Sequence, residues 1–119
     1  MNNKNYFING ITEMLILFLL AQRDCYVYEI TKAICRLSEG LLSISQNTIY
    51  TATYKLETEH KISEYAKLVG KKRTRIYYHI EPAGTQYLSE LLDTYRKTID
   101  GIQKILNASA EEMGKDEKD

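Results

Sequence analysis

Apolar residues recur at helical spacing in two segments between Ile11 and Leu37. Between Ile11 and Gln22 they fall on more than one face, which predicts a helix that is buried on several sides. After a turn at Arg23-Asp24, apolar residues repeat every three or four positions from Val27 to Leu37, and Gly40 follows. This second pattern is typical of an amphipathic helix that ends near the glycine.

A third helix is predicted to begin at Ser45, which can cap its first turn. Only Ile49, Ala52 and Leu56 form an apolar stripe, and the remaining positions of SQNTIYTATYKL (45–56) carry hydroxyls, amides, tyrosines and one lysine. A buried helix would hold more Leu and Val, and a solvated one more Glu, Lys and Ala. The helix is therefore expected to offer a hydrogen-bonding surface to a partner.

The period changes to two further along the chain. Side chains alternate in character over 62–67 and again over 75–80, which predicts two strands. Gly70-Lys71-Lys72 lies between them and predicts a hairpin with a basic tip.

A last helix is predicted from Pro82, a residue suited to the first helical turn. Its apolar residues follow at alternating intervals of four and three, which is a heptad seam that favours a partner helix from a second chain. Together with the very apolar first helix, the seam predicts a homodimer interface made of Leu15, Phe18, Leu88, Leu92, Tyr95, Ile99, Ile102 and Leu106. Residues 108–119 lack apolar spacing and are expected to form a flexible tail.

Composition is that of one globular domain, since the 119 residues are 44% hydrophobic and 27% charged. The apolar run at 14–21 has about half the length that a membrane span requires, and no small-residue cleavage site follows it. We therefore expect a cytoplasmic protein without a membrane segment. Cys25 and Cys35 have no CxxC spacing, which indicates reduced thiols.

Charge is uneven along the chain although the net charge is zero. Residues 41–80 carry seven basic and three acidic side chains, whereas residues 81–119 carry five basic and nine acidic ones. The basic part contains the third helix and the hairpin, which favours an anionic partner such as double-stranded DNA. The candidate DNA-binding residues are Ser45, Gln46, Asn47, Thr48, Tyr50, Thr51, Tyr54, Lys55, Lys71, Lys72, Arg73 and Arg75.

The order of elements predicts an α+β, mainly α fold, a winged helix-turn-helix with a long C-terminal dimerisation helix. In this interpretation residues 1–81 form the DNA-binding domain, residues 82–107 the dimerisation helix and residues 108–119 the tail. Gln46 and Asn47, near the start of the third helix, suit adenine edges, while Tyr50 and Lys55 suit phosphates.

Three stretches in this order resemble the PadR family of bacterial transcriptional regulators, over about Leu15 to Leu106. LILFLLAQRDCYVYEI (15–30) resembles the first helix, the turn and the YE-containing second helix of the family. SQNTIYTATYKLETE (45–59) is similar to its recognition helix, and RIYYHIEPAG (75–84) to the second strand of its wing. The resemblance implies a dimeric, sequence-specific DNA-binding regulator, most simply a repressor that occludes a promoter at an inverted repeat.

The chain also departs from the family pattern. His60 stands where a glycine usually follows the recognition helix, Ile76 where a basic residue is common, and Glu81 where a threonine usually caps the last helix. Some family members bind a small-molecule effector at the dimer interface and often place a tryptophan there. This chain has no Trp and has Tyr95 near that position.

Two other interpretations stay open at this stage. A winged helix that binds only proteins would suit the acidic C-terminal part and would scatter its positive charge. A MarR-like or penicillinase-repressor-like regulator would place different helices around the winged helix. An enzyme is not expected, because His60 and His79 have no partner at catalytic spacing and no phosphate-binding loop occurs; no cofactor and no metal are expected either.

Overall fold

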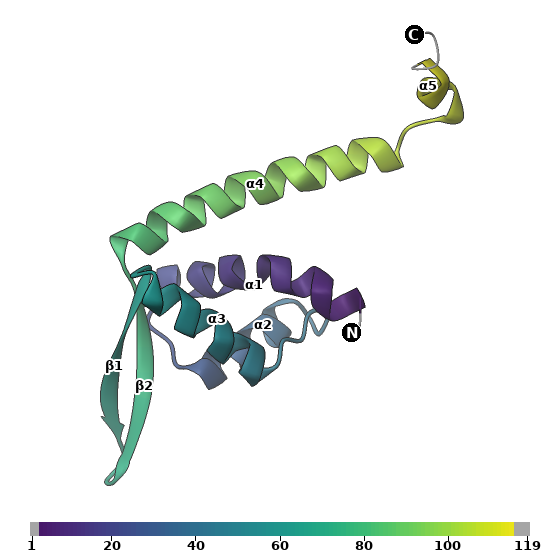
Figure 1. The fold of residues 1–119 in the computed structure, drawn as a ribbon. Coiled ribbons are helices and arrows are strands. Elements are labelled where there is room, and N and C mark those ends of the chain that lie inside the picture. The colour runs from purple at the N-terminus through teal and green to yellow at the C-terminus, as the bar shows by residue number, and fades with distance from the viewer. Residues whose placement is uncertain (1–2, 116–119) are drawn as a thin grey trace. The chain divides into compact units, whose positions relative to one another are not determined.

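The computed structural model describes the backbone of residues 3–115 and the burial of residues 11–115. Five helices and two strands occur in this part of the chain (Figure 1). They are α1 (Asn3–Gln22), α2 (Val27–Leu37), α3 (Gln46–Thr58), β1 (Ile62–Val69), β2 (Arg73–Ile80), α4 (Pro82–Leu106) and α5 (Ala110–Gly114). The predicted α+β, mainly helical winged helix-turn-helix with a long C-terminal helix is confirmed.

Helix α1 begins earlier than the sequence pattern predicts, at Asn3 instead of Ile11. The preceding residues include no proline, and a single glycine inside a helix, here Gly10, costs only about 1 kcal/mol relative to alanine. The absence of apolar periodicity in this segment hid the extension.

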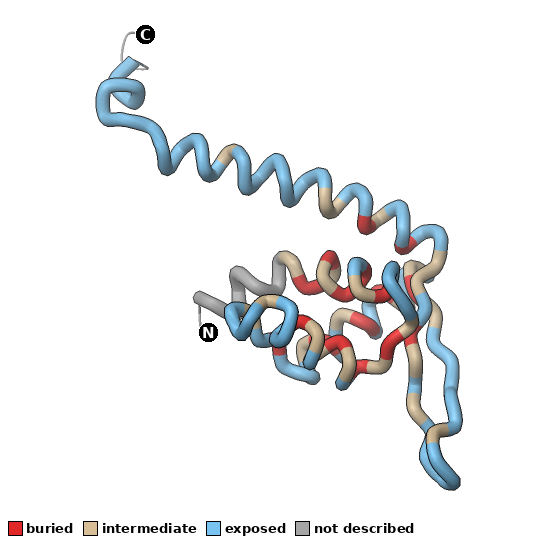
Figure 2. Tube along the Cα trace, turned by 180° about the vertical axis from the view of Figure 1, so that it is seen from behind, coloured by how far each residue is buried: buried red, intermediate tan, exposed pale blue. Residues whose placement is uncertain are grey.

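The described chain divides into two units, one ending at Ser89 and the other beginning at Glu90. The core of the first unit comes from α1, α2, α3 and β1, and Figure 2 shows the buried residues gathered in these elements and at the start of α4. Full burial of a large aliphatic side chain stabilises the fold by roughly 1.5–3 kcal/mol. The most deeply buried side chains are Ile16, Leu17, Leu20, Ile30, Ile49, Leu56 and Ile62.

Helix α3 begins and ends with defined caps. The Ser45 hydroxyl accepts the backbone N–H of Thr48 at 3.2 Å, as its position before the helix predicted. At the other end, the N–H of His60 donates to the Glu57 carbonyl and that of Lys61 to the Leu56 carbonyl, both at 2.9 Å. This is the Schellman pattern, and it requires the left-handed backbone that His60 adopts, with φ of 61°. The chain therefore adopts a left-handed helix end at His60 without a glycine.

The wing, defined here as the β1–β2 hairpin, has antiparallel register from Ile62 opposite Ile80 to Val69 opposite Arg73. Gly70, with φ of 70°, allows the sharp turn at the tip. The segment between α1 and α2 adds a third, very short strand, since Cys25 and Tyr78 exchange backbone hydrogen bonds of 3.3 and 2.8 Å. The wing is thereby joined to the helical body through its second strand.

The first turn of α4 lies very close to the turn that follows α3. A Cβ atom at Gly84 would overlap the carbonyl oxygen of Lys61, and the same oxygen accepts the N–H of Glu81 at 3.0 Å. Only glycine permits this approach.

The second unit contains the rest of α4 and the short helix α5. Helix α5 lies in the stretch expected to be a flexible tail, so the structure differs from that expectation at residues 110–114. A capping box explains the helix: Ser109 accepts the N–H of Glu112 at 3.1 Å, and the Glu112 carboxylate accepts the N–H of Ser109 at 3.3 Å. Such a cap is a local signal that apolar periodicity does not reveal.

Candidate nucleic-acid interface

One face of α3 is fully directed to solvent. Asn47, Thr51, Tyr54 and Thr58 follow at intervals of four, three and four residues, opposite the buried side chain of Leu56. Tyr54 is 73% exposed, and the Thr51 hydroxyl donates to the Asn47 carbonyl at 3.0 Å, which leaves its methyl group and a lone pair outward. The row offers an amide, hydroxyls and a phenol without a charge.

Residues at the amino-terminal end of α3 differ in how far they are available to a partner. The hydroxyls of Ser45 and Thr48 lie 3.0 Å apart and are hydrogen-bonded to each other, so both are partly engaged within the chain. Gln46, Asn47 and Tyr50 are exposed. The two amides predicted to read bases are therefore accessible.

Lys55, which the sequence predicts to be a phosphate ligand, has an ion-pair partner in α1. Its Nζ donates to Glu13 Oε1 of α1 at 2.8 Å, and Tyr87 at the start of α4 donates to the other oxygen of Glu13 at 3.2 Å. This hydrogen bond to Glu13 raises the pKa of Lys55. Helical spacing puts Lys55 on the α1 side of α3, and a charged partner from α1 is invisible in the sequence of α3 itself.

The tip of the wing is basic and exposed. Lys71, Lys72 and Arg73 have no ion-pair partner among residues 11–115. Three exposed cations at the end of a hairpin form an electrostatic surface that attracts an anion.

A hollow of about 330 Å³ lies between α2, α3 and the wing. Arg75, the remaining predicted residue, is half-buried at its edge, and its guanidinium carbon is 4.4 Å from the centroid of the Tyr26 ring. Tyr26 was not among the predicted residues, because only the packing of distant segments brings it to Arg75. The lining residues are Tyr26, Val27, Tyr28, Gln46, Tyr50, Glu64, Thr74, Arg75, Ile76 and Tyr78.

Asp24, in the turn between α1 and α2, holds both strands of the wing. Its carboxylate accepts the Tyr65 hydroxyl of β1 at 2.8 Å and lies 2.9 Å from His79 Nδ1 of β2. Burial raises the pKa of Asp24, but the hydrogen bonds from His79 and Tyr65 outweigh it and lower the pKa. In turn, the hydrogen bond to Asp24 raises the pKa of His79. The sequence placed Asp24 only in a turn.

Two carboxyl groups face each other beside the exposed row of α3. Burial and the neighbouring charge of Glu64 raise the pKa of Glu57, and both residues line a hollow with Tyr50 and Tyr54. The α3 surface is therefore not uniformly attractive to an anion: its wing side near Glu57 is acidic.

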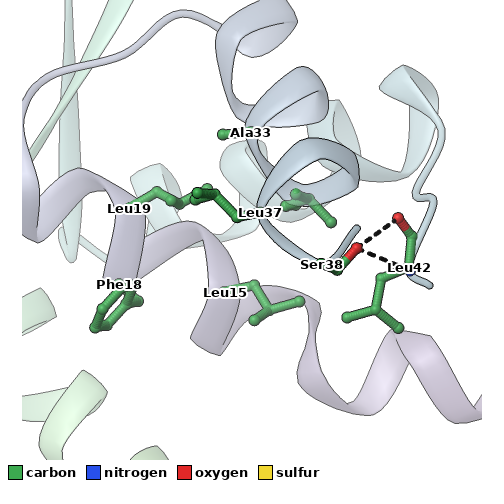
Figure 3. A pocket seen from close by; sticks show the side chains of 8 residues that line it. Leu15, Phe18, Leu19, Ala33, Leu37, Ser38 and Leu42 are labelled. Carbon is green, nitrogen blue, oxygen red and sulfur yellow. Dashed lines mark hydrogen bonds between the residues drawn. The ribbon is translucent and has the colours of Figure 1, made fainter. Parts of the chain in front are cut away.

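The residues predicted to form a dimer interface are partly exposed. Leu15 and Phe18 of α1 line an apolar hollow of about 230 Å³ together with α2 side chains (Figure 3), and Phe18 is 47% exposed. In α4, Leu88 belongs to the core of the first unit and Leu92 is half-buried. The exposed part of the seam therefore consists of Tyr95, Ile99, Ile102 and Leu106.

Other chemistry has little support in the described residues. No helix among them is sufficiently long and apolar to span a membrane. No group of three or more His, Cys, Asp and Glu side chains in residues 11–115 could hold a metal ion. Cys25 is buried, which raises the pKa of its thiol, whereas Cys35 is exposed; both are free.

Residues 16–90 match the Transcriptional regulator PadR-like family. A protein of Lysinibacillus sphaericus named Uncharacterized protein X is 34% identical over 85 residues, which span 71% of this chain and 78% of that protein. Among solved structures, a transcriptional regulator from Clostridium thermocellum is 32% identical with a TM-score of 0.77, covering 87% of this chain and 96% of its own. Bacillus subtilis PadR in complex with operator DNA is 26% identical with a TM-score of 0.62, over 67% of this chain and 45% of that one.

Proposed function

Because this chain belongs to the PadR-like family of transcriptional regulators, we propose that it binds double-stranded DNA in a sequence-specific manner as a homodimer. The observation that carries the proposal is the uncharged hydrogen-bonding row of α3 in the same unit as a wing tip with three unpaired cations. A neutral polar helix can read base edges, and mobile cations can bind phosphates. Bacillus subtilis PadR, a relative of this fold, has been seen with operator DNA.

We assign base reading to Gln46 and Asn47 and phosphate contacts to the tyrosines and the wing. An amide side chain can make paired hydrogen bonds with adenine, and each such pair discriminates by about 1–3 kcal/mol. Lys71, Lys72, Arg73 and Arg75 would neutralise phosphates without reading sequence. We assign Lys55 to holding α3 in place, because its ion pair with Glu13 joins α3 to α1.

The dimer is proposed to form through α4. Tyr95, Ile99 and Ile102 are between 40% and 43% exposed and continue the heptad spacing, so a second copy of the helix would remove them from water. Leu15 and Phe18 are assigned to the same interface. Replacing Ile99 by Asp should give a monomer in sedimentation, because burying an unpaired charge costs several kcal/mol.

The proposed regulator is a cytoplasmic repressor that acts by occluding a promoter. Residues 1–81 would bind DNA, residues 82–107 would dimerise and residues 108–119 would form a terminal tail. A dimer with two recognition helices favours an inverted-repeat operator with half-sites roughly 10 base pairs, or a multiple of it, apart. A small-molecule effector would bind at the dimer interface, where Tyr95 supplies an aromatic side chain.

Selection of bound duplexes from a random pool tests the proposal. We expect a two-fold symmetric site whose preference relaxes at one position per half-site in Gln46→Ala or Asn47→Ala. Tyr50→Phe is the matched control, because losing one hydroxyl should weaken binding about equally for every sequence. Recovery of no duplex, with a protein partner bound instead, would favour a winged helix used only for protein interaction.

The wing tip has a separate test. Replacing Lys71, Lys72 and Arg73 together by Ala should weaken binding to all duplexes and reduce its dependence on salt, with the selected sequence unchanged. Binding as tight as that of the parent at about 0.1 M salt would contradict the role of the tip.

A further inference from the structure

Arg75 is held in an unusual way for a cation near a nucleic-acid surface. It is half-buried, and its guanidinium lies over the Tyr26 ring at 4.4 Å. It has no ion-pair partner among residues 11–115. The carboxylates on either side of Tyr26 in the sequence are engaged elsewhere: Glu29 pairs with Arg23 at 3.0 Å, and Asp24 is bound to Tyr65 and His79. Within residues 11–115, the guanidinium therefore keeps donors that a ligand could use.

Tyr26 is fixed by contacts on several sides. The residue before it, Cys25, exchanges backbone hydrogen bonds with Tyr78. The carbonyl of Tyr26 accepts the N–H of Ile30 at 3.1 Å. Its backbone N–H donates to Glu29 at 3.2 Å. Its ring meets the edge of Tyr77 at a centroid distance of 5.4 Å. A ring held in this way offers a rigid surface on which a guanidinium can stack.

Arg75 shares a hollow with residues from the amino-terminal half of α3. Arg75, Gln46 and Tyr50 line the same hollow of about 330 Å³, with Tyr28 on its α2 side. Glu64 also lines it, and its carboxyl group interacts with Glu57 of α3. A cation with free donors next to an amide and a phenol suits a phosphate group beside the base that the amide reads.

We propose that Tyr26 is a positioning residue for DNA binding, whose ring holds the Arg75 guanidinium at this hollow to receive one phosphate of the strand contacted by Gln46. The proposal rests on the proposed function and adds a subsite to it. An arginine side chain that is already ordered loses less conformational freedom on binding than a free one. The ring thus contributes to affinity without touching DNA.

The experiment compares variants of the full chain on a fluorescein-labelled duplex that carries the selected site, over a series of salt concentrations. Arg75→Gln should weaken binding roughly tenfold, as expected for loss of a charge-assisted hydrogen bond. It should also reduce the slope of log affinity against log salt by about one, the value for one phosphate. Tyr26→Leu should reproduce most of the loss in affinity, whereas Tyr26→Phe, which keeps the ring, should bind like the parent.

Two further measurements separate positioning from a structural role. The double variant of Tyr26→Leu and Arg75→Gln should bind no more weakly than Arg75→Gln alone, because the ring acts only through the guanidinium. Arg75→Lys leaves the fold and the charge intact but removes the planar group, so it should also weaken binding. This variant tests the proposal even where Tyr26→Leu fails to fold.

The outcomes distinguish this inference from the proposed function. The parent could bind the site with a base preference that depends on Asn47, while Tyr26→Leu or Arg75→Lys leaves binding unchanged. This result would overturn the positioning role alone. Multiplicative losses in the double variant also overturn it. A parent that binds no duplex overturns the proposed function and this inference with it.

Discussion

The Nζ atom of Lys55 in α3 lies 2.8 Å from Oε1 of Glu13 in α1, across 42 positions of sequence. The pair joins one side of α3 to α1. We expect Lys55→Met to lower the free energy of unfolding by at most about 1 kcal/mol, because the lysine side chain is 58% exposed and water screens the pair. Urea unfolding measures this change.

The same variant also tests the assignment of Lys55 away from DNA. Its affinity for the selected duplex should fall much less than that of the triple wing-tip variant. A loss as large as the wing-tip loss would show that Lys55 leaves Glu13 and binds a phosphate.

The contact between His79 and Asp24 predicts that the wing becomes less stable at alkaline pH. The hydrogen bond to Asp24 raises the pKa of His79 above its usual value of 6.5. A raised pKa in the folded state means that the stabilisation is fully present below about pH 6.5 and is lost as the pH rises through the folded-state value. Urea midpoints of the parent should therefore fall more than those of His79→Gln between about pH 6 and pH 8.5. Parallel profiles of the two proteins would contradict the prediction.

Gly84 should tolerate no larger side chain. The Cβ atom of Gly84→Ala would overlap the Lys61 carbonyl oxygen, which also accepts the N–H of Glu81 and cannot move freely. We expect a loss of about 1–3 kcal/mol in the free energy of unfolding, as for other overpacked sites. Gly101→Ala is the matched control, since its Cβ would meet no atom within 4 Å, and it should gain up to about 1 kcal/mol. Equal effects at both sites would rule out the close approach.

The protein should be more stable with glycine at position 60. A left-handed backbone is unfavourable for a residue with a Cβ atom, and His60 has φ of 61°. His60→Gly should therefore raise the free energy of unfolding by about 1 kcal/mol. Glu59→Gly, where φ is −87°, should give no such gain. If thermal unfolding ranks the two variants in the opposite order, the helix does not end as described.

The sequence predicted several elements from local patterns. The apolar stripe of α3, its Ser45 cap and the hairpin around Gly70 depend on neighbours within a few positions, and all three appear in the structure. Heptad spacing likewise predicted a long α4. Periodicity thus indicates which side of a helix or strand faces the core.

Contacts between distant segments could not be predicted in the same way. Asp24 joins Tyr65 and His79 across 41 and 55 positions, and Tyr26 lies under Arg75. A spacing pattern describes one element, whereas these contacts depend on how separate elements pack. For this reason the ion pair of Lys55 with Glu13 was not predicted, and Tyr26 was not assigned at all.

The different burial of the two cysteines has a practical consequence. Only the thiolate reacts with alkylating reagents, and the buried Cys25 has a raised pKa, whereas Cys35 on α2 is exposed. The whole chain contains two cysteines, so a maleimide dye would attach at Cys35 without any engineered residue. Energy transfer between donor-labelled and acceptor-labelled copies would then test whether two copies associate as proposed, without changing the sequence.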